Sequence, residues 1–171
     1  MTTDTNFLGM PVSGDITQGS SRVDQKPIED LAPLFQALVD DPTIVEFGWT
    51  QYTPYFMDGD VCEFGVNGLW VRTTAELRSD GEFQEGHYDL EVEYHPSLGT
   101  VNGHWEGDWP DRNYVKDSYE GPDEVRYDRC HDLDRALQSG AFDNVLLDHF
   151  GDHAVITVRK DSIEIESYDH D

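Results

Sequence analysis

The spacing of apolar residues predicts a helix near the start of the folded part of the chain. Apolar residues recur there at the helical period, and Glu29 and Asp30 suit the positive end of a helix dipole. Proline is tolerated in the first turn of a helix, whereas further along it removes a hydrogen bond and clashes with the preceding turn. We therefore expect a short helix over residues 29–40, with Pro33 in its first turn and its end before Pro42.

Three segments after this helix are rich in β-branched and aromatic residues, the composition that strands favour. They cover residues 44–53, 61–66 and 69–73, and the first two are separated by Pro54 and an Asp-Gly-Asp run at 58–60. These segments predict strands joined by turns.

The segment 87–95 alternates strictly between polar and apolar residues, as a strand with one solvated face does. We expect a strand here, with a solvated polar stripe that consists of His87, Asp89, Glu91, Glu93 and His95. Residues 96–121 are rich in glycine, proline and aromatic residues, and they predict a long ordered loop or short irregular strands.

The C-terminal part of the chain predicts two helices and a hairpin. One helix begins at Pro122 and ends at Gly140, and a shorter one runs from near Phe142 to Gly151. Two short runs of β-formers within residues 154–168 predict a terminal β-hairpin.

This order of elements predicts an α+β fold in a single domain. We expect a mainly antiparallel sheet with a few helices packed on one face and a C-terminal β-hairpin. Residues 1–25 show no apolar period and are expected to form a flexible arm, so the domain covers residues 26–171. The sheet face away from the helices is expected to be wet and strongly acidic.

The charge of the chain restricts its partners. The 171 residues include 36 acidic and 11 basic side chains, which gives a formal charge of −25. Direct binding to nucleic acid or to an anionic membrane is therefore excluded as a charge-driven function, because both are polyanions. An aromatic content of 12 % is high for an acidic disordered chain, so we expect the acidity to lie on a folded surface. The N-terminus has no signal-peptide pattern, and we expect a cytoplasmic protein.

The motifs that commonly accompany enzymatic chemistry are missing from the sequence. There is no phosphate loop, dinucleotide-binding glycine motif or nucleophile elbow. Asp58 begins a run that starts like a calcium loop, but Cys62 and Leu69 occupy positions where that loop needs oxygen ligands. Cys130 lies on the helix face that should be buried, so a catalytic cysteine is not indicated. We expect no cofactor and no catalytic residue.

A metal site is the alternative interpretation. Imidazoles and carboxylates on one sheet face are competent ligands for a divalent cation. Under this alternative the protein is a metal-dependent hydrolase or a metal-binding protein, and its ligands are His87, His95 and His104 with nearby carboxylates.

Two stretches of the sequence resemble a group of small uncharacterised proteins from bacteriophages and some bacteria. These are residues 49–66, which read WTQYTPYFMDGDVCEFGV, and the run FGDHAVITV that begins at Phe150. The resemblance covers about a third of the chain. It implies a phage-type origin, and hence a location in the host cytoplasm, but no activity.

These observations lead to the hypothesis of a non-enzymatic acidic protein that binds a basic host protein. The partner would be a nucleic-acid-binding protein, and the acidic protein would act on it as an anti-defence inhibitor or a DNA mimic. A further alternative is that the acidic protein is an immunity protein against a basic toxin. The expected partner-binding residues are Asp89, Glu91, Glu93, Glu106, Asp108, Asp111, Glu120, Asp123 and Glu124.

Overall fold

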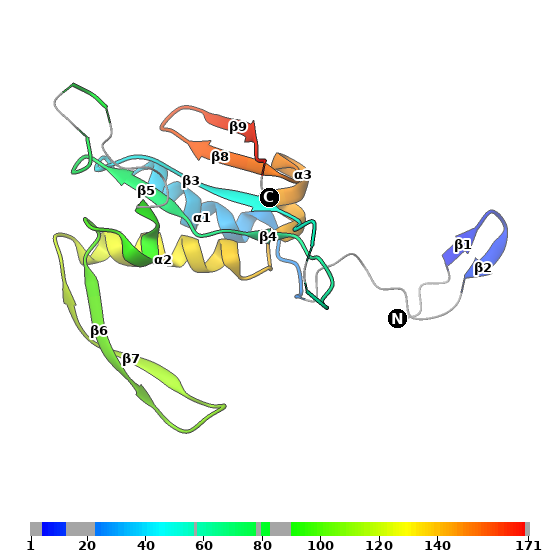
Figure 1. Ribbon diagram of the computed structural model, residues 1–171, viewed down its shortest axis with the longest axis horizontal. Helices are drawn as coiled ribbons and strands as arrows, with labels where there is room; N and C mark the ends of the chain where they lie inside the picture. Colours follow the sequence, from blue (N-terminus) through cyan, green and yellow to red (C-terminus); the bar gives the residue numbers. More distant parts are fainter. Residues whose placement is uncertain (1–4, 13–22, 57, 78–79, 83–89, 170–171) are drawn as a thin grey trace.

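In the computed structural model, the sheet is organised around the long strand β3 (Ile44–Tyr52) (Figure 1). The structure describes residues 5–12, 23–56, 58–77, 80–82 and 90–169. Along one side of β3 lie β8 (Ala154–Val158) and then β9 (Ile163–Ser167), and along its other side lie β5 (Trp70–Thr73) and β4 (Gly65–Val66). Each of these pairings is antiparallel, and β8 and β9 form the predicted terminal hairpin.

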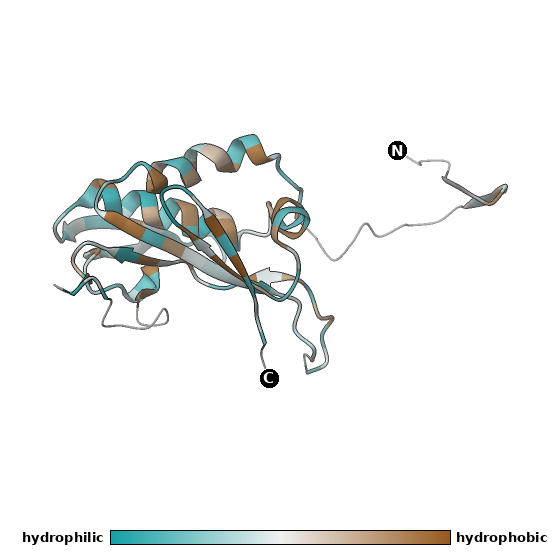
Figure 2. Ribbon diagram, turned by 90° about the horizontal axis from the view of Figure 1, so that it is seen from above, coloured by the Kyte–Doolittle hydropathy of each residue, from teal (hydrophilic) through white to brown (hydrophobic). Residues whose placement is uncertain are grey.

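The three helices cover one face of this sheet, which confirms the predicted α+β fold in a single domain. They are α1 (Ile28–Val39), α2 (Glu124–Gln138) and α3 (Asp143–Phe150). The side chains of Phe47 and Trp49 project from β3 towards them, with ring centroids 5.4 Å from Phe35 of α1 and 5.8 Å from Phe150 of α3. The core therefore lies between the sheet and the helices, where Figure 2 shows the apolar residues of the helices facing the strands.

The first helix has the predicted extent, but its proline is not in the predicted place. Because α1 begins at Ile28, Pro33 is its sixth residue and lies beyond the first turn. The side chain of Pro33 is exposed, so its ring displaces no core residue, and the helix continues to Val39. The helix thus loses one backbone hydrogen bond at this point, but it does not end there.

Arginine side chains lie among the acidic ones on the outer face of the sheet, away from the helices, which was expected to be strongly acidic. Glu46 lies on this face, is only 8 % exposed, and forms ion pairs with Arg72 at 2.6 Å and with Arg159 at 3.2 Å. Arg159 also pairs with Glu164 at 2.7 Å. Acidic side chains on this part of the face are therefore neutralised by arginine.

The segment expected to be the clearest strand is not a strand where the structure describes it. Residues 87–89 lie outside the described residues, Glu91 forms a single bridge with Trp70, and Val92–Tyr94 form a short 3-10 helix, η2. His95, expected to be solvated, is 6 % exposed, whereas Tyr94, expected to be inward, is 78 % exposed. The alternation predicts the burial of Leu90 and Val92 correctly, but of the described members of the polar stripe His95 does not lie on a solvated face.

The segment expected to be a long ordered loop or short irregular strands contains two strands of seven and eight residues. They are β6 (Thr100–Glu106) and β7 (Asn113–Glu120), which pair with each other in a separate antiparallel sheet. Figure 1 shows this hairpin extending away from the rest of the domain. We call residues 100–120 the arm, and residues 23–98 and 121–169 the body.

The N-terminal segment contributes a third, two-stranded sheet and is attached to the body by hydrogen bonds. Strands β1 (Thr5–Phe7) and β2 (Met10–Val12) pair with each other. Further along, the Gln25 side-chain amide donates to the carbonyl of Gly140 at 2.8 Å and accepts from the backbone of Asn144 at 3.0 Å. The chain is therefore joined to the body from about Gln25, close to the predicted domain boundary.

Within the described part of the chain, none of the helices has the length and apolar character needed to cross a lipid bilayer.

Candidate interaction arm

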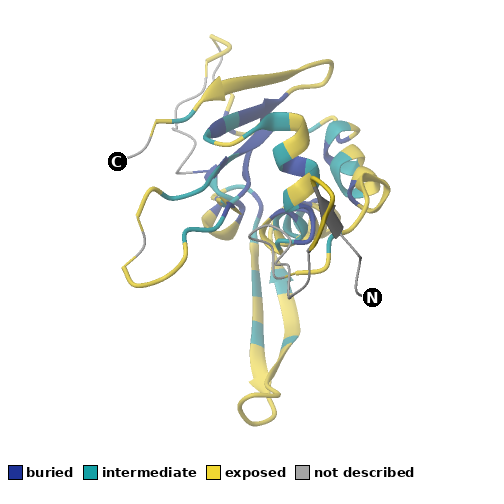
Figure 3. Ribbon diagram, turned by 90° about the vertical axis from the view of Figure 1, so that its right-hand side faces the viewer, coloured by how far each residue is buried: buried dark blue, intermediate teal, exposed yellow. Residues whose placement is uncertain are grey.

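The arm is a regular hairpin that contributes nothing to the core. Its two strands pair from Thr100 opposite Glu120 to Glu106 opposite Asn113. None of residues 100–120, all of which the structure describes, is buried, and Figure 3 shows the hairpin as an almost entirely exposed projection. Hydrophobic burial against the body therefore does not hold this hairpin in place, and its attachment has to be found at its base.

A tyrosine fixes the base of the arm. The hydroxyl of Tyr119 donates to the carbonyl of Leu98 at 2.6 Å and accepts from the backbone of Asp123 at 3.3 Å, so it joins the segments that enter and leave the arm. Gly99 has a positive φ of 95°, and a Cβ there would lie 2.5 Å from the Tyr119 oxygen. A side chain at position 99 is excluded on both grounds, which explains the glycine.

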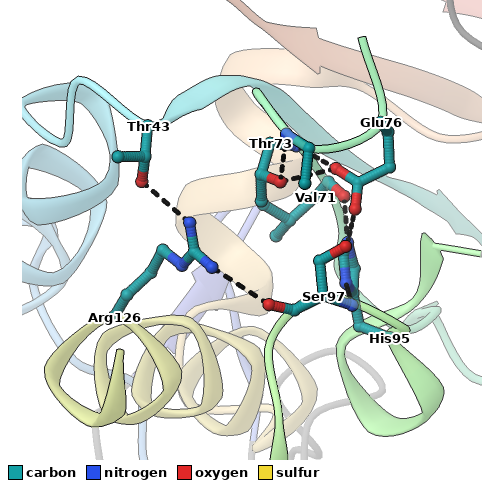
Figure 4. A network of polar contacts seen from close by, with 8 residues as sticks. Thr43, Val71, Thr73, Glu76, His95, Ser97 and Arg126 are labelled. Atoms are coloured by element: carbon teal, nitrogen blue, oxygen red, sulfur yellow. Dashed lines mark hydrogen bonds and ion pairs between the residues drawn. The ribbon is translucent and has the colours of Figure 1, made fainter. Parts of the chain in front are cut away.

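A buried polar network holds the segment that leads into the arm (Figure 4). Arg126 of α2 is 7 % exposed, and its guanidinium donates to the carbonyl of Ser97 and to the hydroxyl of Thr43, both at 3.0 Å. Through this side chain, α2 and the start of β3 are both joined to the base of the arm. Nε of Arg126 is buried without a partner among the described residues, but the two hydrogen bonds of its terminal nitrogens join three segments at one side chain, and they orient the base of the arm relative to the body.

The same network determines the state of His95. Its Nδ1 accepts a hydrogen bond from the backbone of Ser97 at 3.0 Å, so the proton lies on Nε2, which donates to the carbonyl of Val71 at 2.6 Å. Burial lowers the pKa of His95 below its usual 6.5, which favours this neutral ring. The carboxylate of Glu76 also belongs to the network, and hydrogen bonds from Ser97 and Thr73 outweigh its burial and lower its pKa.

On the arm itself, His104 is held between two carboxylates. A bulge after Asn102 leaves Asp117 as an extra residue on β7, and its carboxylate lies 2.8 Å from Nδ1 of His104. The carboxylate of Glu106 lies 2.9 Å from Nε2. These hydrogen bonds, with Asp117 contributing most, raise the pKa of His104, so the ring favours its cationic form with both nitrogens donating.

The outer half of the arm combines aromatic rings with an arginine. Trp105 faces its strand partner Tyr114 edge-on at a centroid distance of 5.1 Å, and the guanidinium of Arg112 lies 4.7 Å from the Trp105 ring. Trp105 is nevertheless 57 % exposed, and Trp109 in the connecting loop is 84 % exposed. Large exposed aromatic side chains of this kind are enriched at the centres of protein interfaces.

The structure divides the predicted partner-binding residues among three places. Asp89 lies outside the described residues, and Glu91 and Glu93 lie in the body. At the start of α2, Asp123 caps the helix by accepting from the backbone of Arg126, and Glu124 pairs with Lys116 at 2.5 Å. The four remaining residues are exposed on the arm, and they are Glu106, Asp108, Asp111 and Glu120.

The alternative metal ligands are not brought together. His95 is buried in the body with both ring nitrogens bonded to backbone groups, His104 lies on the arm, and His87 lies outside the described residues. Within the described ranges there is no group of three or more histidine, cysteine or acidic residues that could hold a metal ion. A nucleophilic role for Cys130 is also disfavoured, because burial raises the pKa of its thiol to about 12.

Several residues that build this region were missed by sequence reasoning. The pairing of His104 with Asp117 depends on the bulge, and the contact of Arg126 with Ser97 joins residues 29 positions apart. Neither feature leaves a local pattern in the sequence. The arm itself could have been found from its two runs of aromatic and β-branched residues on either side of the Gly107–Arg112 loop.

Comparison of the chain with protein-family models, with curated proteins and with solved structures found no match.

Proposed function

We propose that this is a non-enzymatic protein that binds a basic surface of another protein through its arm, and that the partner is a nucleic-acid-binding protein of the host cell. The observation that supports this most directly is the arm itself. It is anchored by a buried network, yet it presents aromatic rings and carboxylates to solvent and adds nothing to the core.

The charge of the arm suits such a partner. Residues 100–120 contain five acidic and two basic side chains, on a protein with a formal charge of −25. Long-range attraction of this kind accelerates association with a basic protein, while desolvated aromatic anchors slow dissociation. Exposed Trp105 and Trp109 are the anchors that we assign to the arm. The resemblance to phage proteins supports a partner in the host cell.

We favour a protein-binding inhibitor over a literal copy of DNA. Seven paired residues span about 24 Å, and a DNA duplex of that length has about 14 phosphate charges. The five carboxylates of the arm fall well short of that density, and His104 pairs with two of them, Glu106 and Asp117. The exposed aromatic rings and the few carboxylates of the arm agree better with a protein–protein interface than with a copy of the DNA backbone.

The proposal can be tested by displacing DNA from its binding proteins. A short fluorescent duplex is bound to each of several basic nucleic-acid-binding proteins purified from bacteria, and this protein is added as competitor. We expect the unaltered protein to release the duplex from at least one of them, more effectively at low salt than at high salt. The arm variant neutralises all five carboxylates of the arm, through Glu106→Gln, Asp108→Asn, Asp111→Asn, Asp117→Asn and Glu120→Gln. We expect it to be at least about tenfold weaker as a competitor.

A control variant separates the effect of the arm from that of total charge. It neutralises the same number of exposed aspartates and glutamates on the body, through Asp24→Asn, Glu29→Gln, Asp148→Asn, Asp161→Asn and Glu166→Gln. We expect it to compete almost as well as the unaltered protein. Equal competition by the arm variant and the unaltered protein would overturn the proposal, and so would the absence of competition with every protein tested.

A further inference from the structure

A hollow on the outer face of the sheet is unconnected with the arm. Its floor is formed by Thr50 of β3 and Val155 of β8, which are directly opposed in the strand register. Their neighbours along these strands, Trp49 and Ile156, face the core, so Thr50 and Val155 point to the opposite side. The hollow has a volume of about 270 Å³, which is below the size of most drug-binding pockets and suits one small group.

Two aromatic rings form walls of this hollow. Trp70 is 3 % exposed and lies over Gly48, where a Cβ would be 2.6 Å from the indole ring, so the glycine leaves room for the ring against the sheet. The guanidinium of Arg72 lies 5.6 Å from the centroid of this ring. Tyr168, after β9, comes from the other end of the chain and packs against Tyr52 at a centroid distance of 5.3 Å. Segments that are distant in the sequence thus converge on the hollow.

The charged group of the hollow is Glu91. Its carboxylate lies beside Gly68, where a Cβ would be 3.2 Å from Oε2, so a side chain at position 68 would press against this oxygen. Burial raises the pKa of Glu91, and the nearby charges of Asp134 and Glu93 raise it further. Among the residues that the structure describes, no lysine, arginine or histidine forms an ion pair with Glu91.

From this arrangement we propose that the hollow binds an organic cation, namely an alkylammonium or alkylguanidinium group, between Glu91 and the rings of Trp70 and Tyr168. Such a ligand would neutralise the half-buried carboxylate and would also gain cation–π attraction from the ring of Tyr168, while Trp70 supplies an apolar wall. An anion would be repelled by Glu91 and its acidic neighbours, and a neutral apolar ligand would bury a carboxylate without a partner. A hard metal ion would find a single carboxylate and aromatic walls instead of a cage of oxygens.

The test uses butylguanidinium and butylammonium as probes and N-butylurea as their neutral counterpart. Binding is followed in the full-length protein by the NMR shifts of the Gly68 and Trp70 amides. We expect both cations to shift these amides with saturation and N-butylurea to leave them in place. Equal binding of the urea would overturn the proposal, because the site would then not recognise charge.

Variants test the assigned groups. Glu91→Gln keeps the shape of the side chain and should weaken the binding of butylguanidinium by at least about tenfold, while Tyr168→Leu should weaken it by about threefold to fivefold. Glu29→Gln, an identical change on the exposed surface of α1, should have no effect. Unchanged binding by Glu91→Gln, with circular dichroism showing that the variant is folded, would contradict the assignment.

Two further measurements identify the source of the cation and separate this inference from the proposed function. A blocked arginine, N-acetyl-arginine methylamide, binding as tightly as butylguanidinium indicates a side chain of a partner protein. Preference for free arginine amide over the blocked compound indicates a small molecule. The arm variant described above should still bind butylguanidinium, because none of its five changes lies in the hollow.

Discussion

The hairpins β8–β9 and β6–β7 differ in how the core supports them. The hairpin β8–β9 adds two strands to the main sheet, and Ala154, Ile156 and Val158 of β8 are almost completely buried. The arm, β6–β7, has slightly longer strands, but no residue in it is buried. The comparison shows that core burial maintains one hairpin, whereas cross-strand contacts and anchors at its base maintain the other. Changes within the arm should therefore affect binding more than folding.

The largest expected contrast comes from the same substitution in the two hairpins. Val158→Ala removes two methyl groups from a site that is 1 % exposed, and it should lower the free energy of unfolding by about 2–3 kcal/mol. Val115→Ala in the arm, at a half-buried site, should lower it by less than about 0.5 kcal/mol. Urea denaturation of both variants measures the difference. Similar losses would show that the arm contributes to the cooperative core.

The next test removes the anchor beneath the arm. Arg126→Met leaves the carbonyl of Ser97 and the hydroxyl of Thr43 without this donor, and it should cost about 1–2 kcal/mol of global stability. We also expect faster amide hydrogen exchange in β6 and β7 than in β8. The control is Arg135→Met on the same helix, where the side chain is 74 % exposed and little change is expected. Equal exchange in the arms of both variants would show that Arg126 does not orient the arm.

A smaller effect is expected from a carboxyl group in the body. Burial and the charge of Glu63 raise the pKa of Asp143 from 3.8 to about 6. An acid with a higher pKa in the folded chain than in the unfolded chain opposes folding when it is ionised, so its cost is absent below about pH 4 and complete above about pH 6. Asp143→Asn should therefore stabilise the protein at neutral pH by about 1 kcal/mol, after allowance for partial exposure, and have no effect near pH 4. Thermal melts of the variant and the unaltered protein between about pH 4 and about pH 7 measure this difference. A stabilisation that is larger near pH 4 than near pH 7 would contradict the prediction.

The smallest effect on stability is expected from the histidine of the arm, because its ring is exposed. NMR titration should place the midpoint of His104 above 6.5, and Asp117→Asn, which removes the larger cause of the shift, should lower it. In the same spectra, His95 should titrate below 6.5, because its burial favours the neutral ring. Identical midpoints for the two histidines would remove the contrast between the exposed arm and the buried network at its base.

The success of sequence reasoning followed the same division between buried and exposed structure. Helices α1, α2 and α3 and the hairpin β8–β9 were predicted, because each has an apolar face that leaves a period in the sequence. For the arm, the sequence predicted only a loop or short irregular strands, because a hairpin exposed on both faces needs no alternation. His95 was misplaced for a related reason: its burial depends on backbone partners at Val71 and Ser97, which local sequence does not reveal.

The candidate site was predicted in part. Four acidic residues chosen from the sequence lie exposed on the arm, namely Glu106, Asp108, Asp111 and Glu120. Whether these residues share a face with the acidic residues at 87–95 was not determined by the sequence, and the structure places Glu91 beside Gly68 and Asp134 in the body. Spatial grouping of charges depends on tertiary contacts, and residue spacing within one segment does not determine it.

The length of the arm also sets how far the protein's charge acts in the cell. At physiological ionic strength, mobile ions screen a surface charge within a Debye length of about 8 Å, so most carboxylates of the body act only close to its surface. Strands of seven paired residues place Asp108 and Asp111, at the far end of the arm, about 24 Å from its base, which is about three Debye lengths. The arm therefore carries negative potential into solvent beyond the screened surface of the body, and under the proposed function this would enlarge the volume from which a basic partner is attracted.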